Sequence, residues 1–253
     1  VLWAARCRLR SAMSATNSEP NTSRSRAVRP LTNAGAKGAS ARKSPSCEMP
    51  AYRVDRLWTG LTAVIIGGGP SLSLAQVQTI ARAKLSGGVR VVAVNNAVYV
   101  AWWADWLHGC DFKWWREHIQ QVQHFTGVRT TLDPTVPDLW KVGLLRNTGR
   151  DGFDADPANC RHGSNGVYQA MHCLIHADVR RIVLVGVDMK RDGERTHWHD
   201  GHGADHVDYA TVMAPHFETL KPALVERRIK VFNASPGSAL EAFPKVSLEE
   251  ALS

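Results

Sequence analysis

The sequence predicts an α/β protein of the three-layer, Rossmann-like class, with a mostly parallel sheet and helices on both of its faces. Two observations support this prediction. Short apolar segments rich in β-branched residues recur along the chain, as in residues 181–188 (RIVLVGVD). Segments with helical spacing of apolar residues separate these runs, and strands that read as continuous apolar runs are typical of sheets buried on both faces. Because strands alternate with helices, the strands are expected to run parallel.

The first half of the chain is expected to contain four strands. They lie at residues 62–67, 91–94, 105–110 and 128–131. The first strand ends in a glycine-rich loop, Gly67 to Leu72, which is followed by helix-forming residues through about residue 84. A second helix, which contains Trp114 and Trp115, is expected after the third strand.

The second half of the chain repeats the alternation. A helix is expected at residues 165–177, a strand at 181–188, a helix from 207 to about 227 and a strand at 229–233. Ligands of such sheets bind beyond the carboxyl ends of the strands. The residues that follow each strand are therefore the candidate site residues.

Size and composition exclude several classes of protein. The chain has 253 residues, of which 44% are hydrophobic and 21% charged. These values are globular and exclude a collagenous or wholly disordered chain. No run of about 18 apolar residues is present, so no membrane span is expected. The formal net charge of +8 would suggest a nucleic-acid or anionic-membrane partner if the charge lay on the folded part.

Most of the positive charge lies in the first 48 residues. Nine Lys or Arg and two acidic residues occur there, so the remaining chain carries a net charge of +1. This Ser-, Ala- and Arg-rich segment lacks apolar periodicity and is expected to be a disordered tail. It fits a transit peptide, a phosphate-binding arm or, because Met49 follows it, sequence upstream of the working protein. Nucleic-acid binding is expected only through this tail, and residues 49–253 are expected to form a single domain.

The cysteines predict neither disulfides nor a thiolate zinc site. There are five, an odd number at scattered spacings with no C-x-x-C pair. Reduced thiols in a cytoplasmic protein are the simplest interpretation.

The loop after the first strand is a candidate anion site. Gly68 and Gly69 let the backbone approach an anion closely, Pro70 favours entry into a helix, and Ser71 is a candidate cap for the following helix, whose free amides would point at a phosphate. The loop matches neither a P-loop nor the dinucleotide G-x-G-x-x-G spacing. A tight turn without ligand is the alternative interpretation.

Asp188 and a histidine cluster are the candidate catalytic groups. Asp188 follows an apolar strand, where a carboxylate can bind a ribose hydroxyl, hold a metal or accept a proton. The histidines of residues 197–206 lie just downstream, and His199 and His202 are the candidate bases. A metal site and a loop of solvated histidines remain open as alternatives, and no metal ligand is assigned.

Other polar residues lie at strand ends or at the entry to the helix at 165–177. These candidate nucleotide-binding residues are Asn95, Asn96, Ser164, Asn165, Gly166, Asn233 and Ser235. Ser164 or Asn165 would cap the helix, and its first amides would then face an anion.

Taken together, these motifs resemble one superfamily in order and spacing. The segments are 65–72 (IIGGGPSL), 94–96 (VNN), 164–168 (SNGVY), 182–188 and 231–238 (VFNASPGS). The superfamily contains bacterial CMP-sialic-acid sialyltransferases, motility-accessory proteins and archaeal pterin-diphosphokinase-like proteins. The chain is most similar to short members often carried on phage genomes, which share the Gly-Val-Asp-Met and His-Trp-His patterns.

The resemblance implies a nucleotide pocket and a transferase activity. It places nucleotide contacts on the first loop, on Asn95 and on the entry to the helix at 165–177, and a catalytic histidine at His199 or His202. The chain departs from the family at Lys190, where the sialyltransferases have tyrosine, and at His162, which occupies the position of their arginine unless a shift of the loop places Arg161 there.

These features predict a nucleotide-sugar-dependent glycosyltransferase-like protein that binds its nucleotide at the strand ends. Two alternatives remain open. One is a pterin diphosphokinase-like phosphotransferase, which alone would need magnesium. The other is a non-catalytic nucleotide-binding accessory protein of a phage. The cofactor and the oligomeric state are not predicted.

Overall fold

The computed structural model describes residues 51–136, 138–199 and 208–253, and confirms the predicted α/β class. Within these residues seven parallel strands form one sheet in the order β5-β4-β3-β2-β1-β8-β9. The strands are β1 (Thr62–Ile66), β2 (Val89–Val94), β3 (Trp106–His108), β4 (Val128–Thr131), β5 (Gly143–Leu144), β8 (Arg181–Val185) and β9 (Lys230–Asn233). Two further short strands, β6 (Arg146–Asn147) and β7 (Asn159–Cys160), pair with each other outside this sheet.

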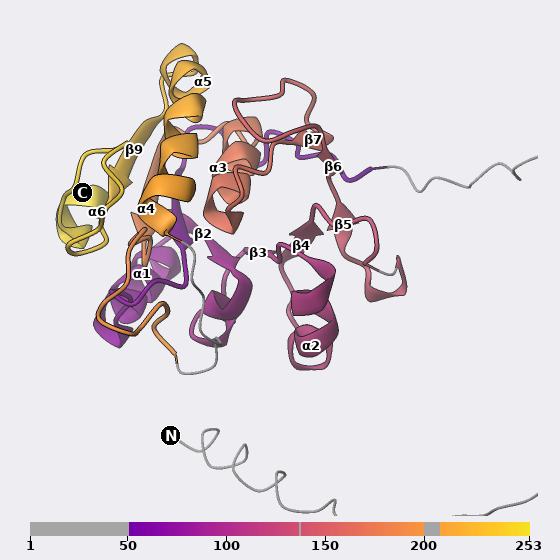
Figure 1. Ribbon diagram of the computed structural model, residues 1–253, viewed down its shortest axis with the longest axis horizontal. Coiled ribbons are helices and arrows are strands. Elements are labelled where there is room, and N and C mark those ends of the chain that lie inside the picture. Colours follow the sequence, from indigo (N-terminus) through magenta and orange to yellow (C-terminus); the bar gives the residue numbers. More distant parts are fainter. Residues whose placement is uncertain (1–50, 137, 200–207) are drawn as a thin grey trace, which may run out of the picture. The chain divides into compact units, whose positions relative to one another are not determined.

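Helices cover both faces of the sheet (Figure 1). One face carries α1 (Leu74–Leu85), α2 (Phe112–Val122) and α6 (Leu248–Leu252). The other carries α3 (Gly166–His176), the 3-10 helix η4 (Ala214–Leu220) and α5 (Lys221–Glu226). Shorter pieces complete the chain: 3-10 helices η2 (Asn95–Tyr99) and η3 (Asp138–Trp140), and the single turn α4 (Tyr209–Val212).

Two apolar layers hold the sheet between its helices. Ile65 and Val92 pack into the layer under α3, whereas Ile66 and Val91 pack into the layer under α1 and α2. Neighbouring residues of a strand point to opposite faces, so a strand buried on both faces must be apolar at every position. Ile65 and Ile66 are fully buried, and burial of each such side chain contributes roughly 1.5–3 kcal/mol.

Several element boundaries differ from the prediction, and two of the differences have a clear physical cause. The strand expected at 181–188 ends at Val185, because Gly186 adopts a left-handed backbone with a φ of 66° and turns the chain away from β1. The helix expected at 207–227 is broken into α4, η4 and α5 in the described residues. Pro215 and Pro222 lie in the first turns of η4 and α5, and proline lacks the amide that a continuous helix would need there.

Two predictions fall outside the described residues. They are the disordered tail at residues 1–48 and the assignment of His202 as a base. In the described part of the chain, the helices are all too short or too polar to cross a bilayer.

The strand order places a crevice in the middle of the sheet. After β1 the chain moves through β2, β3, β4 and β5 on one side, and it returns later to add β8 on the other side of β1. In open parallel sheets ligands bind where the strand order reverses in this way, beyond the carboxyl ends. The loops after β1 and β8 are therefore the walls of the expected site.

Candidate functional site

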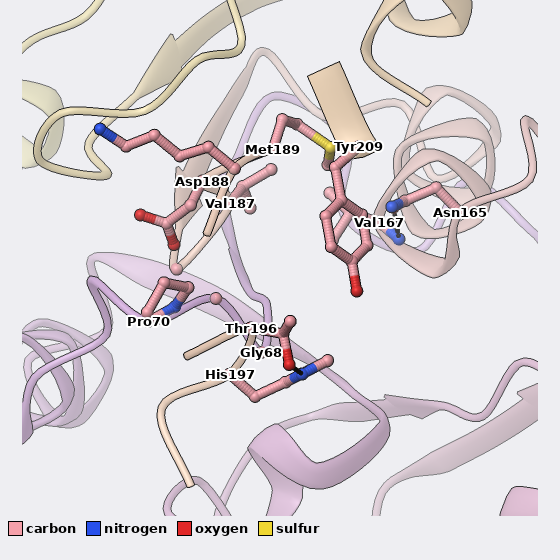
Figure 2. Close-up of a pocket in the computed structure, with 13 residues that line it drawn as sticks. Gly68, Pro70, Asn165, Val167, Val187, Asp188, Met189, Thr196, His197 and Tyr209 are labelled. Carbon is pink, nitrogen blue, oxygen red and sulfur yellow. Dashed lines mark hydrogen bonds between the residues drawn. The ribbon is translucent and has the colours of Figure 1, made fainter. Parts of the chain in front are cut away.

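A pocket of about 100 Å³ opens at this crevice. Figure 2 shows Asp188 and Pro70 on one side of it, Tyr209 and Asn165 on the other, and Thr196 with His197 below. The remaining lining residues are Gly68, Gly69, Val167, Gly186, Val187, Met189 and Lys190. The candidate residues from the first loop, Asp188 and Asn165 thus meet in one place.

The glycine loop is bonded tightly to the chain that follows β8. The Gly69 amide donates to the Gly186 carbonyl at 2.8 Å, and the Ser71 amide donates to Asp188 Oδ2 at 3.3 Å. A Cβ on Gly69 would overlap the Asp188 carboxylate and lie 2.7 Å from the Gly186 oxygen, so only glycine permits this close approach. The amides of Gly69 and Ser71 therefore donate to protein acceptors and are not free to bind an anion.

The cap of α1 is Ser73, and the proposed capping role of Ser71 is wrong. Ser73 accepts a hydrogen bond from the Gln76 amide, and the Gln76 side chain accepts one from the Ser73 amide, which is a complete capping box. Ser71 lies two residues earlier, and its amide bonds to Asp188.

Asp188 is 4% exposed, and burial raises the pKa of its carboxyl above the usual value, against the effect of the Ser71 hydrogen bonds. The backbone before it is held by two serines: the Val187 amide donates to Ser235 Oγ at 2.8 Å, and Ser238 Oγ donates to the Val187 carbonyl at 2.7 Å. Asn233 bonds both serines in turn. Asn233 and Ser235 therefore hold the backbone next to Asp188, and neither residue lines the pocket.

The asparagines after β2 contact neighbouring loops. Asn95, with a φ of 49°, accepts a hydrogen bond from the Cys110 amide at 3.1 Å. Asn96 accepts one from Trp114 Nε1 at 2.7 Å, and its Nδ2 lies 3.0 Å from His199 Nε2. Because an amide nitrogen can only donate, His199 Nε2 is the acceptor of this bond. Asn96 thus anchors the histidine segment to the end of β2.

His197, rather than His199, lines the pocket. Its Nδ1 lies 2.8 Å from Thr196 Oγ1, and its ring centroid is 5.6 Å from that of His199. The Trp198 amide donates to the Gly68 carbonyl at 3.1 Å, which fixes this segment across the glycine loop. The sequence pattern identified the cluster, but it could not show which of two alternating imidazoles faces the pocket.

Asn165 caps α3, and it is one of the two residues, Ser164 and Asn165, that the sequence offered as the cap. Its Oδ1 accepts hydrogen bonds from the Val167 amide at 2.8 Å and the Tyr168 amide at 3.4 Å, and its Nδ2 donates to Met213 Sδ. Gly166 is required by packing, because a Cβ there would overlap Cys110 Sγ. Ser164 is exposed and lies outside the set of pocket-lining residues.

Several pocket residues carry no strand-end signal in the sequence. Tyr209 begins α4 far from any strand, and Figure 2 shows its ring reaching toward Thr196. Lys190 and Thr196 lie in the loop after β8, where the sequence offered Asp188 and the histidines as candidate site residues. Among the described residues, no three His, Cys, Asp or Glu side chains form a group that could hold a metal ion.

Comparison of the sequence with protein-family models and with curated proteins gives no match. Among solved structures, the fold is similar to "Structure of MAf glycosyltransferase from Magnetospirillum magneticum AMB-1", with a TM-score of 0.56 and 17% sequence identity. The alignment covers 79% of this chain and 36% of that chain, so this chain spans about a third of the length of the glycosyltransferase.

At this identity the likeness establishes the shared fold alone. The chain is therefore an α/β protein with a glycosyltransferase-like fold. The expected resemblance to motility-accessory proteins agrees with this neighbour, whereas membership of the phage-borne group stays a prediction.

Proposed function

We propose that this chain binds a nucleotide-sugar in the pocket at the ends of β1 and β8 and acts as a glycosyltransferase. The observation that carries the proposal is the convergence of a buried carboxylate, an imidazole and several hydrogen-bond donors on one pocket at the reversal of strand order. The similarity of the fold to that of a glycosyltransferase supports the same assignment.

The donors in the pocket suit an anionic, hydroxyl-rich ligand. Lys190 lines the pocket, although its ammonium lies beside Gly237 and would have to turn to reach a ligand, and Asn165 and Tyr209 lie on the wall opposite Asp188. The loop amides of Gly69 and Ser71 already bond to protein atoms, so side chains are the groups left to bind phosphate oxygens. The Asp188 carboxylate would accept a hydrogen bond from a sugar or ribose hydroxyl.

The reaction would be a displacement at the anomeric carbon. An acceptor hydroxyl oxygen forms the new bond to that carbon, and the bond from the carbon to the nucleotide phosphate oxygen breaks. His197 would take the proton of the acceptor, because its ring lines the pocket. His199, which Asn96 anchors one residue beyond Trp198, is the second candidate for this role.

Binding would require the pocket to enlarge. Its volume of about 100 Å³ is well below the roughly 300–1,000 Å³ of typical small-molecule sites. The hydrogen bond from the Trp198 amide to the Gly68 carbonyl joins the histidine segment to the glycine loop beside the pocket. We propose that this bond opens when the ligand enters.

A thermal-shift panel tests the proposal. The protein is measured with CMP, UDP-sugars, GDP-sugars, and ATP with magnesium. A ligand at one hundred times its Kd adds about 2.7 kcal/mol, which corresponds to a rise in Tm of roughly 5–10 °C for a domain of this size. D188N should lose the shift, whereas the matched control D192N, an exposed residue of the same loop, should keep it.

The outcomes separate the competing functions. No shift with any nucleotide contradicts the proposal. A shift that needs both ATP and magnesium would indicate the diphosphokinase-like reaction instead. A shift with a nucleotide-sugar that the protein neither hydrolyses nor transfers would indicate a non-catalytic binding module, which the internally bonded glycine loop also fits.

A further inference from the structure

A second cavity lies at the opposite end of the sheet from β9. It has a volume of about 400 Å³ and is lined by Tyr52, Gly127, Val128, Arg129, Asp138, Lys141, Val142, Gly143 and Leu144. Its walls come from β4, β5 and the segments beside them, and β2 and β3 separate β4 from β1 (Figure 1). At about 4.8 Å between strands, β4 and β1 are roughly 14 Å apart. This cavity is therefore distinct from the pocket after β1 and β8.

The cavity is lined by two cationic side chains, Arg129 and Lys141. Arg129 is half-buried, and burial lowers the pKa of its guanidinium; the side chain forms no ion pair or hydrogen bond with any described residue. Lys141 is exposed, and its ammonium forms no ion pair or side-chain hydrogen bond within the described ranges. By contrast, Lys84 and Arg90 at the start of β2 both pair with Asp105. A partly desolvated guanidinium without an anion is unfavourable, because proteins pair such charges.

Apolar residues also line this cavity. The Tyr52 ring packs directly against Gly143, where an added Cβ would lie 2.7 Å from the ring, and Val142 and Leu144 extend the same surface. Asp138, an exposed carboxylate, is also part of the lining. The cavity lining therefore combines two cations, one exposed carboxylate and an apolar surface, and its volume lies within the range of small-molecule sites.

We propose that this cavity is a second small-molecule site, which binds an organic anion through Arg129 and Lys141 with the apolar body of the ligand against Tyr52. The ligand carries a carboxylate or a phosphate monoester, the two groups whose oxygens match the paired donors of a guanidinium. The inference does not depend on the proposed transferase function.

Amide chemical-shift mapping of the intact chain tests the site. The probes are phenyl phosphate, benzoate, inorganic phosphate and, as a neutral control of similar shape, benzamide. The two aromatic anions should shift the amides of Gly127, Val128 and Gly143, and benzamide should not. The relative affinities of phenyl phosphate and benzoate distinguish a phosphate ligand from a carboxylate ligand.

Variants separate a specific site from general attraction of anions. R129Q should weaken binding of the better anion about tenfold or more, as expected for the loss of a charge-assisted hydrogen bond. R146Q, a change at an exposed arginine on β6, and D188N should leave it unchanged. Equal affinity in R129Q, or shifts in the wild-type chain that avoid the three amides, would overturn the proposal. If R129Q does not fold, K141Q and the wild-type map decide the question.

Discussion

Three buried histidines among the described residues should make the stability of this protein depend on pH. Burial lowers the pKa of His108 to about 4, that of His172 to about 3 and that of His176 to about 4; the nearby His176 also lowers that of His172. His108 Nε2 lies 2.7 Å from Gln169 Oε1, and its Nδ1 lies 2.9 Å from Thr130 Oγ1, so the neutral ring is fully bonded in the core.

The direction of the effect follows from these values. The ordinary pKa of histidine, near 6.5, applies in the unfolded chain, so between about pH 6.5 and 4 the unfolded state binds protons that the folded state does not. The free energy of unfolding is therefore unaffected by these histidines above pH 6.5, and it decreases as the pH falls through this window. Each histidine contributes at most about 1.4 kcal/mol per pH unit, and the three together about 4 kcal/mol per unit between pH 6 and pH 5.

Guanidinium chloride unfolding at pH 7, 6.5, 6, 5.5 and 5 measures this slope. The H108Q variant should show about two thirds of the wild-type slope, whatever its stability at pH 7, because one titrating ring is gone. The control H124Q replaces an exposed histidine and should keep the full slope. A wild-type slope below about 1.4 kcal/mol per unit, or an unchanged slope in H108Q, would refute the reasoning.

Three further predictions concern the loops that form the pocket. G69A should lower the free energy of unfolding by about 2–4 kcal/mol, since its Cβ would displace the Asp188 carboxylate; an unchanged denaturation midpoint would contradict the close packing described here. N165A should cost about 1 kcal/mol through loss of the α3 cap, and N165D should restore most of it when both are compared by chemical denaturation. S73A should cost about 1 kcal/mol by removing the α1 capping box. An effect of S71A on α1 amide exchange as large as that of S73A would show that the cap is misassigned.

The sequence was sufficient for the order and type of the main elements. The strands β1 and β8 follow from runs of apolar residues after a polar first residue, because a strand buried on both faces has little room for polar side chains. The residues just after β1 and β8 could be predicted to lie together as a candidate site, because parallel strands end at a common edge of the sheet. The Asn165 cap is likewise a local property of a polar side chain ahead of an apolar helix.

Several features needed contacts between distant segments. Strand β5 has only two residues, too few to show any periodicity, and it forms through its pairing with β4. The prediction of one long helix before β9 was wrong, because Pro215 and Pro222 lie in the first turns of separate helical segments.

By itself, the sequence determined an alternating α/β chain with a glycine loop, an aspartate after an apolar strand and a histidine cluster near one edge of the sheet. Only the tertiary structure decided that β8 lies beside β1 and that His197 lines the pocket. It also decided that the Asp188 carboxylate accepts a hydrogen bond from the Ser71 amide of the glycine loop. Local patterns specify which side of a helix or strand is apolar. The pairing of strands far apart in the chain, and the direction of a side chain in an irregular loop, depend on contacts that no local pattern contains.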